Sequence, residues 1–348
     1  MLWLPKMESA ASHVHSGDTK TRDNTTTRGH RILVCVDRSK PADACLAYSI
    51  VLARALGSDL TLVHVMQPHP QVGPHPDALD WEISRQEARA YLEHLEEDAV
   101  RALGRPADVR LEQGRAPERI VELAREIRAD LTVMGSHADR AATAWNLGST
   151  VQQIVTVSRG SVLIAPASSP IAAAPQRIIV PLDGSQRTES VLPTVARIAN
   201  TYDAELILLH ITQELLPTSV LHNGEDLELA SRLASRLKIS AKAYLEGLRA
   251  RLVREGARVR TLVMHHANQR HCIVEIAKRE HADLIAVAAH GAACDPARTF
   301  GSVTEYLLAH STVPLLVLQD LPDSDMHTPE LGDRLAPPLR ASYPPECV

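Results

Sequence analysis

Two segments of this sequence combine glycines with a Gly-Ser pair that can open a helix. They are residues 134–150 (MGSHADRAATAWNLGST) and 287–303 (VAAHGAACDPARTFGSV). Glycine lets backbone N–H groups turn toward an anion and lets a phosphate approach the chain closely. A Gly-Ser pair that opens a helix adds free N–H groups, the helix dipole and a hydroxyl donor. The residues with this potential are Gly135, Gly148 and Ser149 in the first segment, and Gly291, Gly301 and Ser302 in the second.

An aspartate follows the first apolar run of each half. Asp37 closes RILVCVD and Asp183 closes RIIVPLD. In an open parallel sheet, ligands bind at the carboxyl ends of the strands, so each aspartate is expected beside the glycine segment of its own half. There it can accept hydrogen bonds from a ribose or a base. Each motif alone is more often a helix start or an Asx turn, but the motifs in register and duplicated favour a nucleotide site.

The two sets of motifs belong to an internal repeat. Asp37 and Asp183 are separated by 146 positions, whereas Gly148 and Gly301 are separated by 153. The extra residues fall in the loop and long helix after the second strand, where insertions cost little. IVELAREIRADL and IVEIAKREHADL align without a gap at the larger offset. Side chains shared at fixed offsets indicate a duplicated domain.

Each half alternates short apolar runs with helical patterns. This order predicts right-handed βαβ units and parallel strands. We therefore expect an α/β fold of two tandem open parallel five-stranded sheets with helices on both faces. The predicted strands of the first half are 32–37, 59–65, 108–114, 129–137 and 161–167, and its predicted helices are 43–56, 81–103, 117–128 and 149–157.

Composition shifts mark the expected domain boundaries. Polar residues 1–29 are predicted to be a disordered leader, and the Pro-rich residues 320–348 a flexible tail. The domains are expected at 30–167 and 177–319, joined by a short linker at 168–176. The Pro-rich loop 67–79 is expected to be mobile. A short linker favours packing of the two halves on one another.

Bulk properties narrow the function classes. The chain has 348 residues, a net charge of −5 and 45% apolar residues, so neither nucleic acid nor an anionic membrane is an expected partner. The five cysteines are scattered, which favours a reducing compartment. No signal peptide or membrane span is evident in the sequence. We expect a cytoplasmic protein.

These features resemble the universal stress protein family over roughly residues 31–167 and 177–318. ATP-binding members carry G-x-x-G, nine residues, then G-[ST] after the fourth strand. This sequence has Gly135-x-x-Ala138 and Ala288-x-x-Gly291, each with the nine-residue gap and Gly-Ser. The resemblance implies an adenine nucleotide alpha hydrolase-like fold, an internal pseudo-dimer and a stress-response regulator that binds ATP, with or without Mg²⁺. The nucleotide-site residues it implies are Pro181, Asp183, Ile211, Ala288, Gly291, Gly301, Ser302 and Val303 in the second half, and Asp37, Val65, Gly135, Gly148, Ser149 and Thr150 in the first.

The sequence favours the second half as the better site. Ala138 replaces a family glycine in the first half, and Arg38 replaces the glycine that follows Asp183. If position 138 needs a positive φ, alanine there costs about 1 kcal/mol. We therefore expect Asp183→Ala to weaken ATP binding more than Asp37→Ala does.

Three function classes remain open at this point. The first is an ATP-responsive regulator that acts on an unidentified protein partner. The second is a nucleotide-independent scaffold with degenerate pockets, alone or as a homodimer. The third is an enzyme, which the lack of a Walker motif and of a metal-binding carboxylate pair disfavours beyond slow ATP hydrolysis. The histidines of HHANQRH (265–271) do not have metal-ligand spacing, and Cys294, beside Asp295, is expected to be an inert thiol.

Overall fold

A computed structural model of the chain describes residues 30–38, 40–67, 78–136, 148–157, 160–166, 174–213, 224–293, 295 and 298–320. The predicted leader, most of the loop 67–79 and the tail beyond residue 320 therefore lie outside the described residues. The first half contains β1 (Arg31–Cys35), α1 (Lys40–Leu56), β2 (Asp59–Met66), α2 (Ala78–Leu103), β3 (Asp108–Gln113), α3 (Ala116–Glu126), β4 (Leu131–Ser136), α4 (Ser149–Val157) and β5 (Ser161–Pro166). The second half contains β6 (Arg177–Pro181), α5 (Gln186–Glu189), α6 (Leu192–Tyr202), β7 (Glu205–Gln213), α7 (Gly224–Arg254), β8 (Arg258–His266), α8 (Gln269–Arg279), β9 (Leu284–Ala288), α9 (Ser302–His310) and β10 (Leu315–Leu318).

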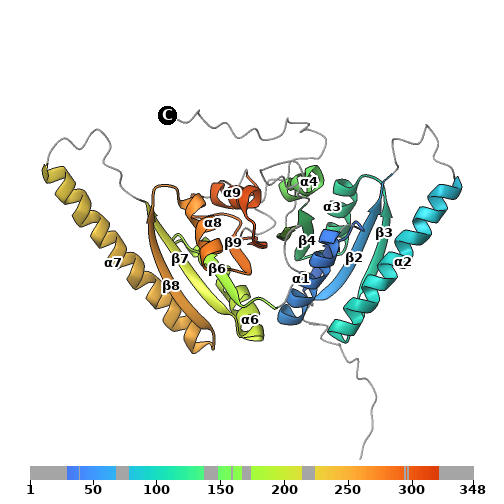
Figure 1. Ribbon diagram of the computed structural model, residues 1–348, viewed down its shortest axis with the longest axis horizontal. Helices are drawn as coiled ribbons and strands as arrows, with labels where there is room; N and C mark the ends of the chain where they lie inside the picture. Colours follow the sequence, from blue (N-terminus) through green and yellow to red (C-terminus); the bar gives the residue numbers. More distant parts are fainter. Residues whose placement is uncertain are drawn as a thin grey trace, which may run out of the picture.

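The two predicted sheets join into one. In the described part of the chain the strand order is β3-β2-β1-β4-β5-β10-β9-β6-β7-β8. All strands within each half are parallel, which confirms the predicted α/β class. The single antiparallel pairing among these strands joins β5 to β10. We call the pairing of β5 with β10 the seam between the two halves. Figure 1 shows the two halves side by side, with α2 and α7 as the outermost helices.

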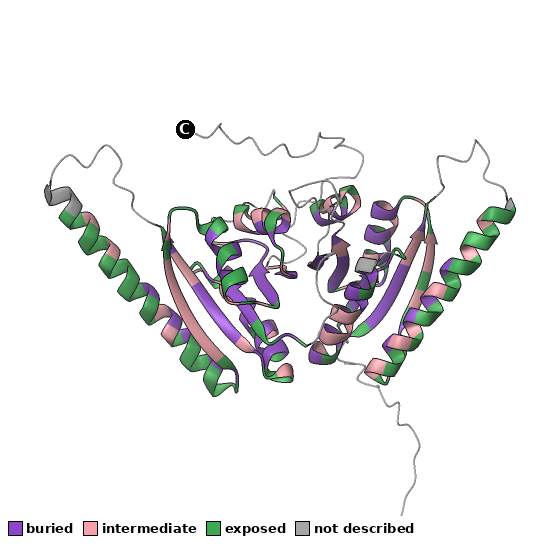
Figure 2. Ribbon diagram, viewed as in Figure 1, coloured by how far each residue is buried: buried purple, intermediate pink, exposed green. Residues whose placement is uncertain are grey.

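Successive side chains of a strand belong alternately to two apolar clusters, one on each face of the sheet. On β1, Ile32 and Val34 join the cluster formed with α1, α2, α6 and α7, whereas Leu33 joins the cluster formed with α3, α4, α8 and α9. Successive strand residues point to opposite faces, so a strand covered on both sides must be apolar throughout. The central strands are buried while β3 and β8 at the edges are partly exposed (Figure 2).

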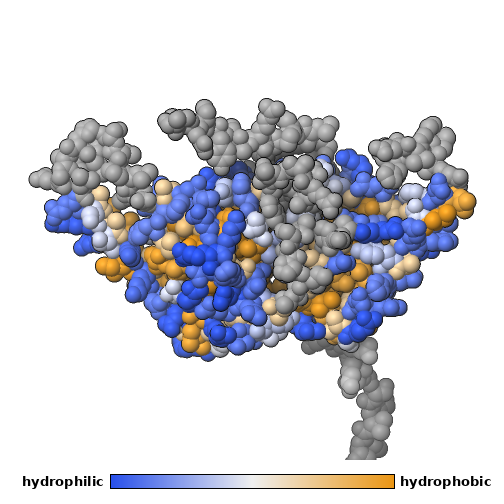
Figure 3. Space-filling view, viewed as in Figure 1, coloured by the Kyte–Doolittle hydropathy of each residue, from blue (hydrophilic) through white to orange (hydrophobic). Residues whose placement is uncertain are grey.

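Among the described residues, the exposed large hydrophobic side chains lie on α2 and α7. Figure 3 shows hydrophilic residues interspersed with hydrophobic ones on both halves of the visible face. Among the described residues, no helix is long and apolar enough to cross a membrane.

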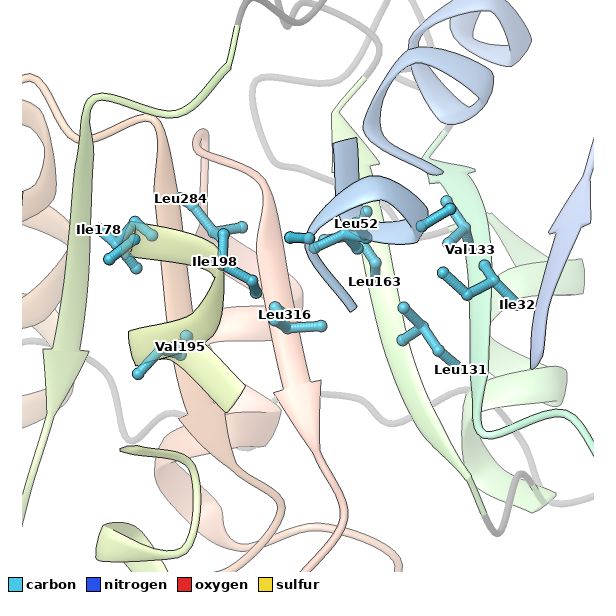
Figure 4. Close-up of a cluster of buried hydrophobic side chains, with 14 of the residues drawn as sticks. Ile32, Leu52, Leu131, Val133, Leu163, Ile178, Val195, Ile198, Leu284 and Leu316 are labelled. Atoms are coloured by element: carbon cyan, nitrogen blue, oxygen red, sulfur yellow. The ribbon is translucent and has the colours of Figure 1, made fainter. Parts of the chain in front are cut away.

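The seam between the halves is a continuous core. Leu316 of β10 lies opposite Leu163 of β5, and both are almost fully buried. Figure 4 shows Leu163 beside Leu52 of α1 and Leu316 near Ile198 of α6, in one buried cluster. On the same face Tyr202 donates its hydroxyl hydrogen to the Val51 carbonyl at 2.8 Å. The expectation that the two halves pack on one another is confirmed by this pairing of β5 with β10.

The repeat extends to individual hydrogen bonds. His64 Nδ1 lies 2.8 Å from the Val36 carbonyl oxygen, and His210 Nδ1 lies 2.8 Å from the matching Leu182 oxygen. Each imidazole fixes the chain that leaves the first strand of its half. These two strand-end histidines therefore have a structural role.

Arg38 adopts a left-handed backbone conformation, with φ of 64°, where the second half has Gly184. A non-glycine residue there costs about 1 kcal/mol. Arg38→Gly is therefore expected to raise the free energy of unfolding by about 0.5 kcal/mol, since glycine also loosens the unfolded chain. The exposed Arg38–Glu87 ion pair (2.9 Å) is lost in this variant, but such pairs contribute little.

Urea denaturation measures this change. Glu87→Gln removes the same ion pair without touching the backbone, so it is the matched control and should stay within a few tenths of a kcal/mol of the wild type. A lower stability for Arg38→Gly than for Glu87→Gln would contradict the strain argument.

Candidate functional site

A pocket of about 360 Å³ opens at the carboxyl ends of β1, β2 and β4. Its size lies within the range of small-molecule sites. It brings together all six residues implied for the first half, which come from four separate elements or loops. They are Asp37, Val65, Gly135, Gly148, Ser149 and Thr150. α4 lies at the corresponding upper edge of the sheet in Figure 1.

The pocket has apolar walls and a polar rim. Val36, Met134 and Ile154 are buried in its walls. Asp37 and Ser149 are exposed at its mouth. An apolar recess beside a carboxylate and a helix start can hold a base, a sugar and a phosphate at three successive points.

The start of α4 lines the pocket with backbone N–H groups that suit an anion. Gly148 has φ of +72° and open space where a side chain would be. The Gln152 N–H donates to the Gly148 carbonyl at 3.0 Å, which is the first hydrogen bond of this helix. In an α-helix the N–H groups before that bond have no partner within the helix, so they favour an anion. The glycine thus leaves room in front of donors that suit a phosphate.

Two thiols of the same pocket are not nucleophiles. Burial raises the pKa of Cys45 to about 12 and raises the pKa of Cys35 further still. Both side chains line the wall. Because the thiolate is the reactive form, these residues act as apolar wall groups near neutral pH.

In the second half, the carboxylate of Asp183 accepts hydrogen bonds from other residues of the same half. Asp183 Oδ1 accepts hydrogen bonds from the Ser185 N–H (2.9 Å) and the Thr188 hydroxyl (2.8 Å), and Oδ2 accepts one from the Ala292 N–H (2.8 Å). Burial opposes the charged form, yet these hydrogen bonds lower the pKa of Asp183 below its ordinary value. The carboxylate therefore holds the loop after β9 against β6. At the matched place in the first half, Ala42 stands where Thr188 stands here.

The loop after β9 fits closely against this carboxylate. A Cβ atom on Gly291 would lie 2.6 Å from Asp183 Oδ2, so position 291 must be glycine in this arrangement. Gly301 begins α9 in an extended conformation. The other implied residues of this half lie on elements around the loop: Pro181 ends β6, Ile211 lies in β7, Ala288 ends β9, and Ser302 and Val303 open α9.

A buried ionic cluster holds the other side of this loop. The Asp320 side chain is fully buried, and its Oδ1 accepts the His290 N–H and lies 3.0 Å from His290 Nδ1. The Arg187 guanidinium donates to Asp320 Oδ2 at 3.0 Å. His290 Nε2 faces the Arg298 carbonyl at 2.9 Å. Both imidazole nitrogens thus face acceptors, and only the protonated ring can donate to both.

Comparison with known proteins agrees with this fold and repeat. The model of the universal stress protein family matches residues 29–166 and again residues 175–319. The chain belongs to the universal stress protein family.

Individual relatives resemble one half or the whole chain. A universal stress protein of Methanocaldococcus jannaschii is 28% identical over 41% of this chain and 94% of its own length. One from Thermus aquaticus is 33% identical over 38% of this chain and 96% of its own length. The crystal structure of a universal stress protein from Archaeoglobus fulgidus covers 84% of this chain and 98% of its own, with a TM-score of 0.57 and 16% identity. That last likeness concerns the fold alone.

Sequence reasoning missed several residues of this universal stress protein. Asp320 was assigned to the tail, and no local motif distinguishes it from other acidic residues there. The pocket walls Cys45, Ile120 and Ile154 read as ordinary helix core. The repeat offset, which pairs Cys45 with the buried Val191, gave no sign of a cavity.

Some sequence predictions fall outside this description. His137, Ala138 and Cys294 lie outside the described residues.

The histidines of segment 265–271 contact protein groups. His265 lies 2.5 Å from the Thr212 hydroxyl and His271 pairs with Glu275. Among the described residues, no cluster of three or more His, Cys, Asp or Glu side chains could hold a metal ion.

The His290–Asp320 pair should make stability depend on pH. The hydrogen bond to Asp320 raises the pKa of His290 above its ordinary value, although burial opposes this. A raised pKa in the folded state means that the contribution is complete below the unfolded value of about 6.5 and is lost as pH rises through the folded value. The wild type should therefore lose more stability than His290→Gln does on going from about pH 6 to pH 9.

Urea denaturation across that range tests this expectation. His94→Gln is the control, because His94 is 70% exposed on α2 and should leave the pH profile of the wild type unchanged. Parallel profiles for the wild type and His290→Gln would show that the imidazole is not held as a cation.

Proposed function

We propose that this universal stress protein is a stress-response regulator of the cytoplasm that binds ATP, with or without Mg²⁺, in the first-half pocket. The proposal departs from the ranking that the sequence favoured. The observation that carries it is the convergence of Asp37, Gly135, Gly148 and Ser149 on one 360 Å³ pocket. In the second half, Asp183 accepts three hydrogen bonds, from Ser185, Thr188 and Ala292.

The residues of the first-half pocket suit the parts of a nucleotide. The apolar wall of Val36, Val65 and Met134 suits an adenine. Asp37 can accept hydrogen bonds from ribose hydroxyls, and the start of α4 can bind phosphate. ATP binding would then change the surface that a protein partner meets at this edge. We expect regulation with at most slow ATP hydrolysis.

Binding stoichiometry tests the proposal directly. Titration calorimetry with ATP should give one site per chain, and Gly148→Val should abolish it because a branched side chain fills the space before α4. Gly57→Val is the matched control, since Gly57 has a similar φ (+67°) and similar open space at the turn before β2. Loss of binding in both variants would indicate a general effect of strain and would remove the argument from Gly148.

A nucleotide-independent scaffold is the second candidate function. The engaged carboxylate of Asp183 favours it for the second half, because a satisfied loop offers a fixed surface. Nucleotide released from the purified protein by heat distinguishes the two. The scaffold function replaces the first proposal if no nucleotide copurifies and millimolar ATP gives no binding.

A further inference from the structure

The loop between β9 and α9 of the second half reaches across to the first half. The Thr299 hydroxyl donates to the Thr156 carbonyl in the last turn of α4 at 2.7 Å. Carbonyls in the last turn of a helix have no partner within the helix. Thr299 therefore caps the carboxyl end of α4, and it does so from the other half of the chain.

This cap acts on a helix that needs support. α4 has only nine residues, and helices of that length are marginal without tertiary contacts. Its first residues, Ser149 and Thr150, line the first-half pocket. A shift or fraying of α4 would therefore move the donors that we assign to phosphate.

The neighbours of Thr299 are fixed on both sides. The Arg298 carbonyl lies 2.9 Å from His290 Nε2, and the Arg298 guanidinium pairs with Glu305 at 2.7 Å. Phe300 is 4% exposed, and the Gly301 N–H donates to the Ala289 carbonyl at 2.8 Å. A loop held in this way presents the Thr299 hydroxyl in one place.

The same loop is tied to its own half by two aspartates. Asp183 accepts the Ala292 N–H, and buried Asp320 binds His290 and Arg187. Directly before Asp320, the Gln319 N–H donates to the Ser161 hydroxyl at the start of β5, at 3.1 Å. The ionic cluster around Asp320 thus lies beside β5, the first-half strand that follows α4.

We propose that the loop between β9 and α9 of the second half is a positioning element for the first-half pocket. In this role Thr299 fixes α4, and Asp320 fixes the loop. This inference rests on the proposed ATP site. In this arrangement the second half has a role that does not require it to bind a nucleotide itself. The contact that would couple the halves is the Thr299–Thr156 hydrogen bond.

Amide hydrogen exchange of α4 and ATP affinity together test the inference. Thr299→Val, which keeps the shape but removes the donor, should speed exchange in α4 and weaken ATP binding by roughly 2- to 10-fold, the range of one net hydrogen bond. Thr299→Ser keeps the donor and should restore both values. Asp320→Asn should have the same two effects as Thr299→Val.

Each outcome separates the inference from the proposed function. If exchange in α4 is the same in Thr299→Val as in the wild type, the inference is wrong, whether or not ATP binds. If exchange changes while ATP affinity does not, α4 does not transmit the position of the loop to the pocket, and the inference is also wrong. If the wild type binds no ATP, the proposed function fails, while exchange in α4 still decides whether the loop positions the helix.

Discussion

Leu316→Ala is expected to lower the free energy of unfolding by about 2–5 kcal/mol. Leu316 is 1% exposed and lies opposite Leu163 in the seam of the two halves. The substitution removes buried methyl groups and leaves a cavity that the surrounding strands cannot close without moving both halves. Urea denaturation followed by circular dichroism measures the change.

The same experiment tests whether the halves unfold together. Because β5 and β10 belong to one sheet and one core, we expect a single transition in the wild type and in the variant. Leu229→Ala is the control, since Leu229 is 68% exposed on α7 and its truncation should change stability by less than about 0.5 kcal/mol. Two separate transitions, with only the second half affected, would mean that the seam does not couple the domains.

Asp37→Ala is expected to weaken ATP binding about ten- to hundred-fold, which corresponds to a charge-assisted hydrogen bond of about 1.5–3 kcal/mol. Asp37 lies at the rim of the first-half pocket, at the end from which a ribose can be bound. Titration calorimetry with ATP measures the affinity.

The matched control is the same substitution in the other half. Asp183→Ala should leave ATP affinity within a few-fold of the wild type, because its carboxylate holds Ser185, Thr188 and Ala292. A reversal, in which Asp183→Ala abolishes binding and Asp37→Ala does not, would assign the nucleotide to the second half, as the sequence had favoured. Circular dichroism of both variants confirms that each is folded.

The fold could be predicted from the sequence because its signals are local or repeated. The apolar run of RILVCVD and the period of IVELAREIRADL each determine a buried strand or an amphipathic helix from neighbours in the chain. The repeat then doubled this information, since Asp37 and Asp183 had to occupy the same place in two domains. The predicted helix 149–157 matches α4 at both ends.

Six residues that line the first-half pocket could also be predicted to lie at one sheet edge, because each is near the end of a strand or opens a helix there. Gly135, Gly148 and Asp37 line the same pocket for that reason. The ranking of the two halves by the family motif, which favoured the second half, stays a prediction. It does not include the hydrogen bonds that Asp183 makes to Ser185, Thr188 and Ala292.

The sequence by itself determined the order of strands and helices along each half and the duplication, and it singled out six of the residues that line the first-half pocket. Tertiary structure alone decided that Asp183 is engaged by Ala292, that Asp320 is buried against His290, and that Thr299 caps α4 of the other half. The physical reason is the distance in sequence between partners. Asp183 and Ala292 are 109 residues apart, and Thr156 and Thr299 are 143 apart. Only the packed sheet brings such groups within hydrogen-bonding distance, and no local pattern records it.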